Sequence, residues 1–123
     1  MKSIMQKSLL ILTLILLLSS VVFVFSKRME KFESMPVIKY FYLDTCGWCK
    51  KFNPEWEKFE KMVKDNKVSV VVQKLNATEN EKEVDKENIQ GFPHVHLVNN
   101  GKRIDFEEDR TAEELMKFVK KNL

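Results

Sequence analysis

Cys46 and Cys49 are the two cysteines of the chain, and only Gly47 and Trp48 separate them. If a helix begins here, Cys46 and Cys49 lie on one face of it, because they are three positions apart. Their Cβ atoms would be about 5–6 Å from each other, close enough for a disulfide to form and break. The first sulfur would lie at the helix N-terminus, where unpaired N–H groups and the positive end of the dipole favour a thiolate. The spacing predicts a nucleophilic Cys46 and a resolving Cys49, although half of a zinc site has the same spacing.

The residues around the cysteines predict a strand and then a helix. Pro36–Leu43 is a β-rich apolar run, with the strand expected from Val37, and Cys49–Lys64 carries apolar residues at helical spacing. Val68–Leu75 is a β-branched run of the kind that forms a buried parallel strand. Together they predict a βαβ unit with a right-handed crossover and with the cysteines between its first strand and its helix.

The rest of the chain predicts a short helix, a hairpin and a final helix. A polar, acidic segment favours the short helix near Lys82–Asn88. The segments His94–Val98 and Lys102–Phe106 flank a turn sequence that ends in Asn100-Gly101, as in a β-hairpin. Thr111–Glu114 is a capping box, and apolar residues at helical spacing follow it to the C-terminus. The whole pattern predicts an α/β domain.

From Pro36 to the C-terminus, the sequence resembles the thioredoxin family, including the protein disulfide isomerase domains. The resemblance implies a thioredoxin fold, which is a central mixed sheet flanked by helices, with a cis peptide bond between Phe92 and Pro93. The full-size family fold has an additional strand and helix, for which residues 26–35 leave no room, so we expect a fold trimmed at the N-terminus. Besides the cysteine pair, four features follow the family's order, namely Pro54, Lys74, Gly91-Phe92-Pro93 and Asn100-Gly101.

The resemblance implies a thiol-disulfide oxidoreductase that acts on protein disulfides or dithiols through Cys46 and Cys49. The expected partners are protein substrates and an unidentified electron donor or acceptor, with no cofactor beyond the Cys46–Cys49 disulfide. In this family the loop that holds Phe92 and Pro93 packs over the disulfide and binds extended substrates through main-chain hydrogen bonds. We expect Trp48 to contact substrates as well, because tryptophan often anchors interfaces.

The sequence departs from the family in the residues that assist the cysteines. Between the cysteines, Gly47 and Trp48 help to set the reduction potential, and Trp48 replaces a proline or histidine. Tyr40 stands where the family buries an acid, and an unperturbed phenol is a poor base at neutral pH, so we expect slow resolution of mixed disulfides. Lys74 is either a surface lysine at a strand end or a proton-handling group, acting alone or with Asp44.

Two histidines follow the expected cis-proline. His94 stands where the family commonly has threonine, and it is a candidate for tuning the Cys46 thiolate. His96 shares a strand face with His94, and we interpret it as an ordinary residue of a half-exposed strand. We expect no metal, because one C-x-x-C is incomplete for a structural zinc site, although zinc or copper held by both cysteines and His94 is an alternative.

A second class of function stays open beside the enzyme. The same domain would serve as a redox-inactive binding or chaperone-like module if its cysteines formed a structural disulfide or held a metal. Replacing Cys46 by serine separates the two classes, because it abolishes exchange in an enzyme and unfolds a module that depends on the disulfide.

The N-terminal segment predicts a membrane helix. Leu9–Phe25 is almost entirely apolar and reaches about 25 Å as a helix, just enough to span a bilayer. We expect a signal-anchor or transmembrane segment over residues 1–26, a linker over 27–36 and the thioredoxin-like domain over 37–123. A cleaved signal peptide is the alternative, since Lys2 and Lys7 form a basic region before the apolar run.

Charge gives weaker guidance on orientation and partners. The excess of Lys and Arg after the segment favours a cytoplasmic domain, whereas the signal-like layout and the cysteine pair favour the lumenal or extracytoplasmic side, which we expect. The chain would then be a single-pass membrane protein with the bilayer as a partner, or secreted if cleaved. The formal net charge of the chain is +3, and Lys2 and Lys7 supply two of these positive charges. The domain is therefore nearly neutral, and we expect no nucleic-acid binding.

Overall fold

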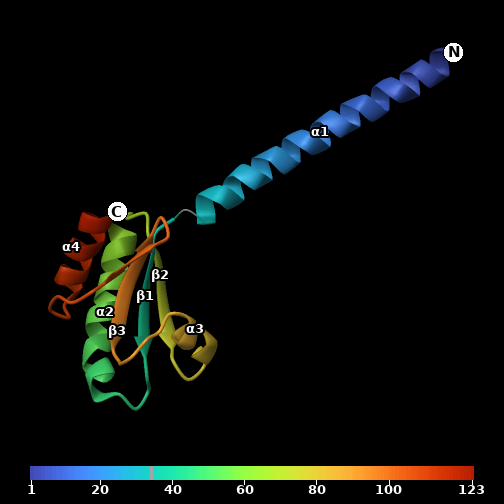
Figure 1. The fold of residues 1–123 in the computed structure, drawn as a ribbon. Helices are drawn as coiled ribbons and strands as arrows, with labels where there is room; N and C mark the ends of the chain where they lie inside the picture. The colour runs from blue at the N-terminus through green and yellow to red at the C-terminus, as the bar shows by residue number, and fades with distance from the viewer. Residues whose placement is uncertain (34) are drawn as a thin grey trace. The chain divides into compact units, whose positions relative to one another are not determined.

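The computed structural model describes residues 1–33 and 35–123, and it divides the chain into two compact units at this point. The first unit is one helix, α1 (Lys2–Glu33). The second unit holds the cysteine pair within an alternation of strands and helices (Figure 1). Its elements are β1 (Val37–Tyr42), α2 (Gly47–Asp65), β2 (Val71–Asn76), α3 (Glu81–Lys86), β3 (His94–Asn99), β4 (Lys102–Asp105) and α4 (Ala112–Asn122).

The helix α1 is long and apolar enough to cross a membrane. Within its span from Lys2 to Met29, an 18-residue window has a mean hydropathy of 2.8, and none of that window is buried. A signal sequence meets the same criteria, so an anchor and a cleaved signal both remain consistent with α1. The helix also continues through residues 27–33, which the sequence assigns to the linker, and Ser34 of that linker lies outside the described residues.

The second unit is built on a mixed sheet with the strand order β2-β1-β3-β4. β1 pairs in parallel with β2, with Val37 opposite Val71, and antiparallel with β3, with Tyr40 opposite Val95. β3 continues into β4 through the predicted hairpin. In Figure 1, α2 and α4 lie together on one side of this sheet and α3 lies on the other. A mixed sheet flanked by helices confirms the predicted fold.

The prediction of a buried strand over residues 68–75 was wrong in two respects. β2 begins at Val71, and residues Val71 to Leu75 are only half-buried. The physical reason is the strand order, since β2 is an edge strand that pairs with β1 alone among the described strands. An edge strand keeps one flank open, whereas its apolar sequence is typical of a strand buried on both faces.

The apolar core lies between the sheet and the pair of helices α2 and α4. Side chains alternate between the two faces of a strand, so every second residue of β1 and β3 reaches this core. The helices meet the sheet with residues at helical spacing, as the sequence predicted for both. The main core residues are Ile38, Tyr40, Val95, Leu97, Phe52, Trp56, Phe59, Leu115, Phe118 and Val119.

Local signals in the sequence explain the ends of these elements. The hairpin turns at Asn100 and Gly101, whose φ angles of 51° and 73° are those of the tight turn that Asn-Gly favours. The Thr111 side chain accepts a hydrogen bond from the Glu114 backbone N–H at 3.2 Å, which caps α4 as expected. Pro54 lies within α2, and the Phe92–Pro93 peptide is cis, as the resemblance implied.

Candidate functional site

The cysteine pair lies at the N-terminus of α2. Cys46 is the N-cap residue, and its Sγ accepts a hydrogen bond from the Cys49 backbone N–H at 3.1 Å. Both residues are free thiols, with Cys46 half-buried and Cys49 buried. In thiol-disulfide exchange the attacking sulfur must be accessible to the substrate disulfide, and Cys46 is the less buried of the pair. Cys46 therefore has the position and the access of a nucleophile.

Cys49 has a different environment. Burial raises the pKa of the Cys49 thiol, and its hydrogen bond with Cys46 raises it further. Burial acts in this direction because a thiolate loses more hydration energy than a thiol does. Cys49 thus stays protonated while Cys46 reacts, which suits the residue that closes the cycle.

Tyr40 lies beneath the pair, at the position where the resemblance led us to look for an acid. Its hydroxyl donates to Asn53 Oδ1 at 3.0 Å and approaches the Cys49 carbonyl at 3.4 Å. Burial, followed by the nearby Cys49, raises the pKa of Tyr40 above its usual value. The phenol therefore remains protonated at neutral pH and does not supply a base.

Lys74 contacts an aromatic ring of the neighbouring strand β1. Lys74 lies opposite Tyr40 in the β1–β2 pairing, and its Nζ is 5.2 Å from the centroid of the Tyr42 ring. Asp44, its suggested partner, instead accepts a hydrogen bond from Asn76 Nδ2 at 2.9 Å. Within the described residues, neither Lys74 nor Asp44 has a hydrogen bond to Cys49, so a proton-handling role for Lys74 stays a prediction.

Trp48 borders a surface groove next to the cysteines. It is 65% exposed, and the Lys51 ammonium lies 4.7 Å from its ring centroid. Gly47 has open space where a side chain would begin, so the backbone at the pair is accessible. The groove has a volume of about 430 Å³ and is lined by Trp48, Lys51, Phe52, Phe106, Glu107, Glu108, Asp109 and Arg110.

The other two expected substrate residues, Phe92 and Pro93, line a different cavity. This second cavity also includes His94, Arg103 and Asp105, and Trp48 does not border it. The structure therefore does not gather the three expected substrate residues around one cavity, and their joint role stays a prediction.

His94 faces away from Tyr40. In the β1–β3 pairing, Tyr40 lies opposite the core residue Val95, so His94 projects from the other face of the sheet. Its Nε2 lies 3.0 Å from His96 Nδ1 and 3.1 Å from Arg103 Nη2. Among the described residues, these and Asp105 are its polar neighbours and neither cysteine is, so tuning of Cys46 by His94 has no contact to support it.

His96 is fully buried, which corrects its interpretation as a residue of a half-exposed strand. The Phe41 ring stacks on it at 5.8 Å, and its Nε2 lies 2.6 Å from Glu87 Oε2. Burial, followed by the positive charge of Arg103, lowers the pKa of His96 to about 4. The imidazole is therefore neutral at pH 7, and residues from outside β3 account for its burial.

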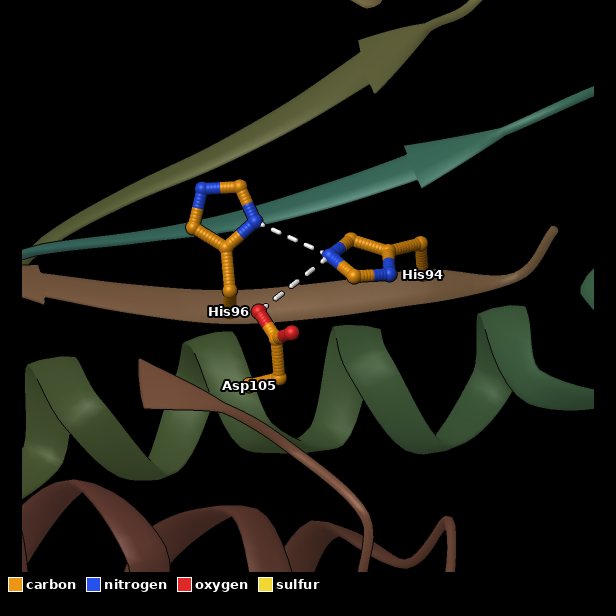
Figure 2. Close-up of side chains that lie close together, drawn as sticks. All are labelled: His94, His96 and Asp105. Carbon is orange, nitrogen blue, oxygen red and sulfur yellow. Dashed lines mark hydrogen bonds and ion pairs between the residues drawn. The ribbon is translucent and has the colours of Figure 1, made fainter. Parts of the chain in front are cut away.

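A polar network on this face escaped prediction from the sequence. Lys39 of β1 forms ion pairs with Glu83 at 2.7 Å and with Glu87. Burial alone would lower the pKa of Lys39, but its contacts with the two carboxylates outweigh burial and raise it. Figure 2 shows that His94, His96 and Asp105 point toward one another, and their donor atoms lie within 4.8 Å of one another.

One signal would have found Asp105. A two-residue turn at Asn100-Gly101 fixes the hairpin register, and that register places His96 opposite Asp105. The contribution of Glu87 had no such signal, because it comes from the end of α3, where no local pattern relates it to β3.

Comparison with known proteins agrees with this fold. The model of the thioredoxin family matches residues 19–121. Mouse protein disulfide-isomerase A4 is 34% identical over 84 residues, which cover 68% of this chain and 13% of that protein. The Drosophila melanogaster protein disulfide-isomerase is 35% identical over 92 residues, covering 73% of this chain and 18% of that protein. The chain thus spans only a small part of these relatives.

Solved structures give the same result. The first thioredoxin domain of mouse protein disulfide-isomerase A4 has a TM-score of 0.63 at 34% identity, over 70% of this chain and 61% of that one. The first two thioredoxin domains of Saccharomyces cerevisiae Eps1p give 0.67 at 27% identity, over 79% of this chain and 38% of that one. Because the family model matches most of the chain and a relative is 34% identical, the chain belongs to the thioredoxin family, with a domain of the protein disulfide-isomerase type.

Proposed function

We propose that this protein is a thiol-disulfide oxidoreductase for protein substrates, with Cys46 as the nucleophile and Cys49 as the resolving thiol. The observation that carries the proposal is the asymmetry of the pair. Cys46 Sγ accepts a backbone N–H at the start of α2 and is partly accessible, whereas Cys49 is buried with a raised pKa.

The reaction follows from this asymmetry. The Cys46 thiolate attacks one sulfur of a substrate disulfide, a mixed disulfide forms, and the other substrate sulfur leaves as a thiolate. Cys49 then loses its proton and attacks Cys46 Sγ, which closes the Cys46–Cys49 disulfide and releases the second substrate thiolate. Two electrons pass from the cysteine pair to the substrate. The reverse sequence oxidises a substrate dithiol.

Deprotonation of Cys49 is the step with the least help from the protein. Tyr40 keeps its proton at neutral pH because its pKa is raised, and it occupies the place next to Cys49. We therefore expect the mixed disulfide to resolve slowly, with water or a substrate group accepting the proton.

Two serine variants of the full chain, held in detergent micelles, test the assignment. Cys49→Ser should accumulate a mixed disulfide with a protein substrate, because attack proceeds and resolution does not. Cys46→Ser should accumulate none. The reversed pattern, or unchanged disulfide turnover in Cys46→Ser, would exclude this mechanism.

Titration of the same chain in graded thiol-disulfide buffers gives the direction of electron flow. A potential near about −270 mV would indicate a reductant, and one near about −180 mV an oxidant or isomerase. The absence of any reversible couple would favour the alternative of a redox-inactive binding module. A Cys/His metal site in that module has little support, since the polar contacts of His94 are with His96, Arg103 and Asp105.

We further propose that α1 holds this domain at a membrane, on the lumenal or extracytoplasmic side. The candidate span from Lys2 to Met29 would reach about 42 Å as a helix, and its apolar part, Leu9–Phe25, about 25 Å, against about 30 Å for the hydrocarbon core of a bilayer. N-terminal sequencing of the mature protein distinguishes an anchor from a cleaved signal, and protease protection of sealed vesicles reports the side. Release of the protein by alkaline carbonate would contradict anchoring.

A further inference from the structure

A cluster of potential metal ligands lies on the α3 side of the sheet. His94 and His96 come from β3 and Asp105 from β4, and all three donor atoms lie within 4.8 Å of one another (Figure 2). Two imidazoles and a carboxylate are ligands that zinc accepts, and three protein ligands leave one position of a tetrahedral ion for water. The thiols are not among these ligands, so the cluster is a separate site from the cysteine pair.

The distances suit a small divalent ion. Ligand atoms about 2.1 Å from one tetrahedral zinc ion lie about 3.4 Å from each other. His94 Nε2 lies 3.0 Å from His96 Nδ1 and 3.7 Å from Asp105 Oδ1, so the two distances bracket that value. The three ligand atoms lie within 4.8 Å of one another, and rotation of the exposed Asp105 side chain away from Arg103 would bring them into range.

Glu87 supplies a second, independent observation. Its Oε2 lies 2.6 Å from His96 Nε2, and both atoms are buried without a hydrogen-bond partner within the described chain. If Nε2–H donates to this carboxylate, the lone pair of Nδ1 is directed toward His94 and the centre of the cluster. Histidines that bind metals almost always donate their other N–H to a carboxylate or carbonyl in this way.

Arg103 already brings a positive charge to this place. Its Nε donates to Asp105 Oδ1 at 2.6 Å, and its Nη2 lies 3.1 Å from His94 Nε2. The guanidinium thus occupies the side of the cluster that an ion would take. His94, Arg103 and Asp105 also line a surface cavity of about 670 Å³, so the cluster is open to an ion from solvent.

We propose that His94, His96 and Asp105 bind one zinc ion, with Glu87 orienting His96 and with Arg103 competing for the site. Water completes the coordination on the side of the cavity. This site goes beyond the proposed oxidoreductase function and does not depend on it.

Calorimetric titration with ZnCl₂ tests the site. The protein is the full chain in detergent micelles with Cys46→Ser and Cys49→Ser in place, so that thiols cannot bind the metal. We expect one zinc ion per chain, and binding at least tenfold weaker after Asp105→Asn. Loss of all zinc binding in the double cysteine variant would overturn the proposal, as would equal affinity in Asp105→Asn.

Two further variants test the supporting residues. Glu87→Gln should weaken binding by about 10–100-fold, as is usual for residues that orient a metal ligand. Arg103→Gln should tighten binding, because it removes a competing cation, and weaker binding in this variant would contradict the assigned geometry. Asp109→Asn is the matched control, since it removes an exposed carboxylate outside the cluster and should leave the affinity unchanged.

Discussion

Replacing Tyr40 by phenylalanine separates a structural from a catalytic role of its hydroxyl. This residue occupies the place of the family's buried acid, so a proton-handling phenol would be the simplest substitute for that acid. The structure argues otherwise, because burial raises the pKa of Tyr40. We therefore predict that Tyr40→Phe lowers stability modestly and leaves disulfide turnover at pH 7 within about twofold of the parent.

The size of the stability change follows from the contacts of the side chain. The hydroxyl makes one good hydrogen bond, to Asn53 at 3.0 Å, and such a bond contributes about 1 kcal/mol net. The ring itself is retained, with Phe52 and Trp56 at centroid distances of 4.9 and 5.0 Å, so the larger cost of truncating a buried aromatic residue does not arise. The free energy of unfolding should fall by about 1 kcal/mol.

Urea unfolding of the full chain in micelles, followed by tryptophan fluorescence, to which the buried Trp56 contributes, measures this change. With a slope of about 2 kcal/mol per molar urea, the midpoint should fall by about 0.5 M. Tyr42→Phe is the matched control, because it removes a hydroxyl from the same strand outside the Asn53 contact. A tenfold slower resolution of the mixed disulfide in Tyr40→Phe, with Tyr42→Phe unaffected, would refute the reasoning and assign the proton transfer to the phenol.

Three further predictions concern the site and its support. Attack of Cys49 on the mixed disulfide should accelerate as pH rises toward and past 9, because the raised pKa of Cys49 keeps its thiolate scarce at neutral pH. Release of the substrate thiol in a single turnover measures this rate. Thr111→Ala should cost about 1 kcal/mol in urea unfolding through loss of the cap on α4, with the neighbouring Arg110→Ala as a control. Trp48→Ala should raise KM for a protein substrate without changing turnover of a small-molecule disulfide, and an equal effect on both would exclude a docking role for its exposed ring.

Local signals accounted for much of the fold. The spacing of Phe52, Trp56 and Phe59 predicted both the helix and the face that it buries. Asn100-Gly101 and Thr111 predicted a turn and a cap because each depends on neighbours within four residues. The position of the cysteines at the start of α2 followed from the same strand and helix patterns.

The remainder depended on packing between distant segments. Val71–Leu75 has the composition of a buried strand, and only the strand order makes it an edge. The burial of His96 depends on Glu87 and Phe41, which reach it from α3's end and from β1. Strand alternation fixes which residues share a face, but it does not say which face another element will cover.

The helix α3 is held to the sheet by charged contacts rather than by buried apolar residues, so it can move separately from the core. It has no buried residue, and charged contacts join it and the Glu87 that follows it to Lys39 and Arg103. Such a segment can open locally while the core between the sheet and the other two helices stays intact. The hydrogen-exchange rates of the α3 amides should therefore not change at low denaturant concentrations. The exchange rates of amides around Trp56 should rise with denaturant, because they require opening of the core. Each opening would also admit water to the buried His96.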